Sequence, residues 1–65
     1  MKIVNIRKEG ELRIQVIGIF EDGSEKPLFS YYPDELSFRK NELVGLTEEQ
    51  AKELYHKKDI AYLRQ

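Results

Sequence analysis

The strongest structural signal in this chain is the stretch ELRIQVIGIF, residues 11–20. Its apolar side chains share one parity and polar ones alternate with them: Leu12, Ile14, Val16 and Phe20 against Arg13 and Gln15. A period of two, rich in β-branched residues, predicts a strand with one buried face. Ile17 and Ile19 break this pattern because they share the parity of the polar residues. Two interpretations stay open: a bulge at Gly18 resets the register, or the strand has a second apolar surface.

Further strand signals lie on both sides of this stretch. Residues 2–8 alternate in the same way, and the turn Glu9-Gly10-Glu11 predicts a hairpin between the two strands. After residue 20, the sequence Asp22-Gly23 is a strong turn signal, and it predicts a third strand over residues 26–32. Pro27 near the start of that strand suits a sheet edge, because proline donates no ladder hydrogen bond. A second turn at residues 33–35 and a short fourth strand over residues 36–39 complete the predicted sheet.

The last third of the chain changes to a helical pattern. Thr47 is a predicted N-cap with Gln50 at the reciprocal capping-box position, and the helix is predicted over residues 48–58. Beyond Lys58, a continued helix would place Ile60 and Leu63 off its apolar stripe. For residues 59–65 we therefore favour a short strand or an extended arm that packs back on the core, and a continued helix stays open as the alternative.

These elements predict a single domain, residues 1–65, of the α+β class. It has a small antiparallel β-sheet of three or four strands, in β-β-β-(β)-α order, with one C-terminal helix packed on one face. The predicted core is Val4, Ile6, Leu12, Ile14, Val16, Phe20, Leu28, Leu36, Phe38, Leu46, Ala51, Leu54 and Tyr55. One helix covers one face of such a sheet, so the other face meets water or a partner.

The composition argues against several classes of function. Eleven basic residues against twelve acidic ones give a net charge of −1, which is unlike a protein that binds polyanions by bulk charge. The absence of cysteine excludes disulfides, thiolate metal sites and a cysteine nucleophile, and it suits a cytoplasmic protein. No signal peptide and no membrane span is expected. His56, the only histidine, is predicted to be an exposed residue near the helix end.

The chain is therefore predicted to be no enzyme and to hold neither a metal nor a cofactor. Asp22-Gly23-Ser24-Glu25 lacks the full spacing of a calcium loop, and the glycines build no phosphate-binding loop. The predicted function is a small protein-binding or self-associating module of bacterial or phage type, a homodimer among the options. It acts through the uncovered sheet face, with these protein-binding residues: Ile17, Ile19, Phe29 and Tyr31.

The alternative is a nucleic-acid-binding accessory protein. A basic stripe on the sheet would remain hidden in a chain of nearly neutral net charge. Its nucleic-acid-binding residues are predicted to be Arg7, Arg13 and Arg39, with an aromatic side chain nearby for base stacking. Neither membrane nor metal is among the expected partners.

Overall fold

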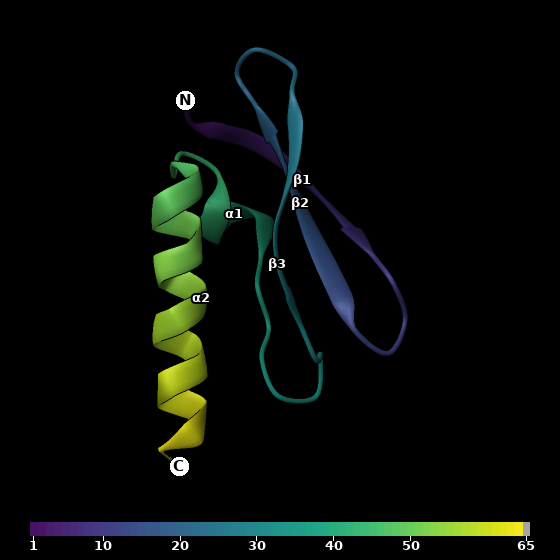
Figure 1. Ribbon diagram of the computed structural model, residues 1–65, viewed down its shortest axis with the longest axis vertical. Helices are drawn as coiled ribbons and strands as arrows, with labels where there is room; N and C mark the ends of the chain where they lie inside the picture. The colour runs from purple at the N-terminus through teal and green to yellow at the C-terminus, as the bar shows by residue number, and fades with distance from the viewer. Residues whose placement is uncertain (65) are drawn as a thin grey trace.

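The computed structural model describes residues 1–64 as a three-stranded antiparallel sheet with two helices (Figure 1). The strands are β1 (Ile3–Glu9), β2 (Ile14–Phe20) and β3 (Glu25–Tyr31), and β2 lies in the middle. A short helix α1 (Lys40–Leu43) and a long helix α2 (Glu48–Leu63) follow. This architecture confirms the predicted α+β class.

The two connections between the strands follow from their turn residues. Gly10 has a φ of 104°, and a Cβ atom there would lie 2.2 Å from the carbonyl oxygen of Arg13, so only glycine fits. In the second turn, the backbone N–H and the hydroxyl of Ser24 both donate to Oδ1 of Asp22, at 3.0 and 2.6 Å. The first connection takes up residues 10–13, which leaves Leu12 outside β2 and 86% exposed. Its predicted place in the core is wrong.

The middle strand keeps its alternation through Gly18, and the irregularities lie in the outer strands. The pairing of β1 with β2 skips Val4, and the pairing of β3 with β2 skips Leu28. The interpretation of a bulge at Gly18 is therefore wrong, and that of a second apolar surface at Ile17 and Ile19 is correct. Gly18 has a different role, because a Cβ atom there would lie 3.0 Å from the side chain of Leu28.

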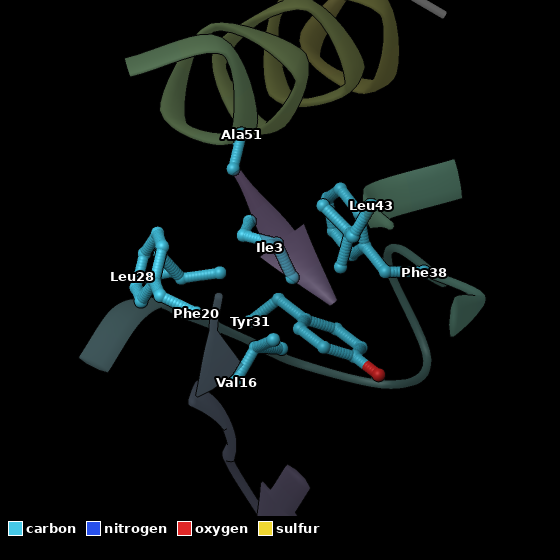
Figure 2. Packing of buried hydrophobic residues seen from close by; sticks show 8 residues of the cluster. All are labelled: Ile3, Val16, Phe20, Leu28, Tyr31, Phe38, Leu43 and Ala51. Atoms are coloured by element: carbon cyan, nitrogen blue, oxygen red, sulfur yellow. The ribbon is translucent and has the colours of Figure 1, made fainter. Parts of the chain in front are cut away.

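The core lies between the sheet and the two helices. Figure 2 shows Ala51 of α2 pointing toward Ile3 of β1, with Leu43 of α1 beside them. The buried cluster consists of Ile3, Val16, Phe20, Leu28, Tyr31, Phe38, Leu43 and Ala51. Five of these were predicted from the sequence. Val4 was also predicted to be buried, but it is 48% exposed because it is the extra residue that the pairing of β1 skips.

The predicted fourth strand is not formed. Residues 36–39 are irregular and lead into α1, and they bury Phe38 in place of pairing with the sheet. The Phe38 ring centroid lies 4.6 Å from that of Phe29 and 5.1 Å from that of Tyr31. Two lysines provide hydrogen bonds for the backbone carbonyl groups of this segment. Lys8 Nζ donates to the carbonyl of Phe38 at 2.6 Å, and Lys58 Nζ donates to that of Ser37 at 2.7 Å.

The long helix begins as predicted and ends later than predicted. Gln50 N donates to Oγ1 of Thr47 at 3.2 Å and Thr47 N donates to Oε1 of Gln50 at 3.0 Å, which is the expected capping box. The helix continues to Leu63, so the predicted strand or arm after Lys58 is wrong for the described residues; Gln65 lies outside them. No glycine or proline interrupts residues 48–64, so the local sequence favours the helix even where Ile60 and Leu63 stay exposed.

Replacing Phe38 tests the role of the irregular segment. Phe38→Ala is expected to lower the free energy of unfolding by about 3–5 kcal/mol, because it empties the centre of the aromatic cluster. Urea unfolding followed by circular dichroism measures this loss. The control is Tyr32→Ala, at a half-exposed aromatic residue, for which we expect a change of about 0.5 kcal/mol. Equal unfolding midpoints for the two variants would contradict the packing described.

The ion pair between Lys58 and Glu42 predicts a loss of stability in acid. The hydrogen bond from Lys58 Nζ, 2.7 Å long, holds the pKa of Glu42 below its ordinary value. The stabilisation is therefore present above the ordinary carboxyl pKa of about 4, and it is lost as the pH falls through the lowered pKa of the folded state. Glu42→Gln should flatten the dependence of the urea midpoint on pH in this range.

A matched variant separates this effect from the other carboxyl groups. Lys58→Met removes the ammonium group and keeps an apolar stem next to Phe38. It should flatten the same part of the pH profile as Glu42→Gln. A profile that keeps the wild-type slope in both variants would show that the pair does not contribute.

Candidate functional site

Among residues 1–64, one face of the sheet has no helix over it. α1 contacts β1 and α2 contacts β3, and Figure 1 shows both helices on the same side of the sheet. The strand register assigns nine residues to the other side, here called the open face: Asn5, Arg7, Glu9, Gln15, Ile17, Ile19, Glu25, Pro27 and Ser30. The open face is the candidate binding surface.

An ion pair crosses the middle of the open face. Arg7 of β1 lies opposite Ile17, and Glu25 of β3 lies opposite Ile19. Arg7 Nη1 donates to Glu25 Oε1, so the pair reaches from one edge strand to the other over β2. A second carboxylate holds the same guanidinium, because Arg7 Nε lies 3.3 Å from Glu9 Oε2.

This pair explains why an isoleucine on an uncovered face is buried. Ile17 is only 9% exposed, and its neighbours across the two strand pairs are Arg7 and Pro27. The aliphatic part of an arginine side chain covers apolar surface while its charged end stays in water. The side chains of Arg7 and Glu25 are themselves 49% and 45% exposed. The apolar centre of the open face is therefore covered by side chains that water reaches.

Of the four predicted protein-binding residues, the structure brings only Ile17 and Ile19 together on this face. Phe29 and Tyr31 lie on the helix side, where Phe29 stacks on Tyr55 at 5.0 Å and Tyr31 is 6% exposed. Both aromatics were expected on the uncovered face with the isoleucines, and that placement is wrong. The cause is the extra residue Leu28, because an inserted residue moves the following side chains to the opposite face.

The three arginines predicted to bind nucleic acid lie on three different segments. Arg7 is on the open face with two glutamates around it. Arg13 lies in the connection between β1 and β2, with its guanidinium carbon 5.8 Å from the ring centroid of Tyr32. Arg39 precedes α1, and its backbone N–H donates to Glu42 Oε1 at 2.9 Å. The open face thus presents one arginine and two glutamates rather than a basic stripe.

The remaining candidate groups fit structural roles. The hydrogen bond from the Ser24 hydroxyl holds the pKa of Asp22 below its ordinary value, as expected for a carboxylate that closes a turn. His56 is exposed on α2, about midway along the helix and not near its end. Within residues 1–64, no group of three or more potential metal ligands is found. In the same part of the chain, no helix has the length and apolar character to cross a membrane.

Comparisons with known protein families, with curated proteins and with solved structures found no match. The candidate function is therefore argued from the geometry of the open face. Three features matter for it: two isoleucines at the centre, an ion pair lying over them, and amide and hydroxyl groups at the rim from Asn5, Gln15 and Ser30. An apolar centre with a polar rim is the usual anatomy of a protein interface.

Because the Arg7 side chain covers Ile17, we expect Arg7→Ala and Glu25→Gln to differ in how strongly they bind an apolar dye. Arg7→Ala removes the side chain from above the isoleucine, so we expect stronger binding of an apolar dye and a loss of stability below about 1 kcal/mol. Glu25→Gln breaks the ion pair and leaves the aliphatic part of Arg7 in place, so dye binding should rise less. Dye fluorescence together with urea unfolding measures both effects. Dye binding that is equal in Arg7→Ala and the wild type would contradict the covering role of Arg7.

Proposed function

We propose that this chain is a small non-enzymatic module that binds another protein, or a second copy of itself, through the open face. The observation that carries the proposal is the position of Ile17 and Ile19 on a face that, within the described residues, only side chains cover. We place this binding in the cytoplasm of a bacterium or a phage-infected cell, on the basis of the cysteine-free, compact and highly charged sequence.

The energetics favour a partner that displaces the Arg7–Glu25 pair. An ion pair of half-exposed side chains contributes about 0–1 kcal/mol, so moving it aside costs little. Burying the apolar surface beneath it yields about 25 cal/mol for each Å² removed from water. A partner that inserts an apolar side chain over β2 and offers one charge of each sign to Arg7 and Glu25 meets both requirements.

The size of the open face indicates a weak, reversible interaction. Strands of seven residues are about 23 Å long, and three of them span about 14 Å. This footprint is small beside the roughly 800 Å² per partner of a standard interface. We therefore expect an affinity typical of transient complexes. Such complexes dissociate during extended washing, so cross-linking before capture is the better method.

The test incubates three proteins with a native lysate, with and without nuclease treatment, and compares the lysate proteins that each of them retains. Ile19→Glu introduces a charge at the half-buried centre of the open face, and Leu12→Glu introduces the same charge at an exposed leucine away from it. If the proposal is correct, the wild type and Leu12→Glu retain lysate proteins that Ile19→Glu does not retain. Circular dichroism verifies that all three are folded.

Two other outcomes are informative. Equal retention by all three proteins would contradict binding through the open face. Retention that disappears with nuclease treatment would favour the nucleic-acid alternative, for which Arg7, Arg13 and Arg39 are then the residues to replace.

A further inference from the structure

The second half of α2 exposes apolar side chains on the side turned away from the sheet. Ile60 is 45% exposed and Leu63 is 71% exposed. Ile60 lies nine residues, or two and a half helical turns, after the buried Ala51, so the two residues point in opposite directions. Leu63 follows one turn after Ile60 and lies on the same side. Figure 1 shows this end of α2 reaching past the turns of the sheet.

Charged residues on the same side of α2 are divided between its two halves. Glu49 and Glu53 lie in the first half, and Lys57 and Arg64 lie in the second half and at the C-cap. All four are exposed. Together with the two apolar residues they form the outer stripe of α2: Glu49, Glu53, Lys57, Ile60, Leu63 and Arg64. The stripe is acidic at one end and basic at the other.

We propose that the outer stripe pairs with the same stripe of a second copy of this chain, with the two α2 helices antiparallel. A two-fold axis near the middle of the helix places the acidic half of each stripe against the basic half of the other. The helix dipoles are then also opposed, which is favourable. In this arrangement Ile60 of each copy lies level with residues 49–53 of the other helix and Leu63 lies level with Glu49, so both leave water against the aliphatic parts of Glu49 and Glu53. A parallel pair would set glutamates against glutamates, so the charge pattern selects the antiparallel arrangement.

This inference goes beyond the proposed function because it uses a different surface. The outer stripe points away from the sheet, while the open face is on the other side of the sheet from both helices. Pairing through α2 therefore leaves both open faces of the dimer free. Two weak binding faces in one particle would raise the affinity for a partner with repeated sites through effective concentration.

The first experiment is light scattering with sedimentation over a range of protein concentrations. The proposal expects a particle of twice the 7.7 kDa of one chain, with a dissociation constant that rises with salt. Replacing both apolar residues, Ile60→Glu with Leu63→Glu, should weaken association by at least about tenfold. Ile19→Glu on the open face and Leu12→Glu in the hairpin should leave it unchanged. Circular dichroism verifies that the variants are helical.

A second experiment tests the antiparallel charge pattern. One variant carries Glu49→Lys and Glu53→Lys, which makes its stripe basic, and another carries Lys57→Glu and Arg64→Glu, which makes its stripe acidic. Each alone should associate more weakly than the wild type, and an equal mixture should form a mixed dimer.

Three results would overturn the inference. The wild type could remain a monomer at every concentration, or a dimer could persist after Ile60 and Leu63 are replaced. A dimer lost in Ile19→Glu and kept in the α2 variant would assign self-association to the open face instead. That last result would contradict the α2 pairing while supporting the proposed function.

Discussion

The burial of Phe38 is the contact on which the rest of the structure depends. Its ring packs against those of Phe29 and Tyr31 of the sheet, and its centroid is 6.2 Å from that of Tyr55 of α2. The segment that carries it forms no strand, so its backbone needs other partners. Lys8 from β1 and Lys58 from α2 supply them, and Lys58 also reaches Glu42 of α1. One irregular segment thus ties the sheet to both helices.

The placement of Phe38 also decides which face of the sheet is free. Because the connection and both helices gather on the side of Phe29 and Tyr31, the side of Ile17 and Ile19 receives no covering element among the described residues. The chain protects that side with the ion pairs that Arg7 makes to Glu9 and Glu25, the second of which crosses the middle strand. These side chains shield the isoleucines from water, but a partner can displace them at little cost in free energy. This is the physical basis for proposing a binding face there.

Much of the fold could be predicted from local signals in the sequence, but the candidate site could be predicted only in part. The alternation within residues 11–20 predicted a strand there, which the structure forms over Ile14–Phe20, and the capping box at Thr47 predicted the start of α2. The placement of Phe29 and Tyr31 failed because the extra residue Leu28 moves both to the other face. The contact between Arg7 and Glu25 was also missed. Eighteen residues separate them in the chain, and only the strand order brings them together.

The sequence by itself determined the class of fold, the two turns at Gly10 and Asp22-Gly23, and the N-terminus of the long helix. Each of these depends on residues within about four positions of one another, so neighbouring side chains and φ preferences are sufficient. The tertiary structure alone decided the path of residues 36–39, the face on which Phe29 and Tyr31 lie, and the cover over Ile17. These features depend on strand register and on contacts between distant segments. A single extra residue in a strand moves the side chains that follow it to the opposite face of the sheet, and no local pattern in this sequence marks that residue.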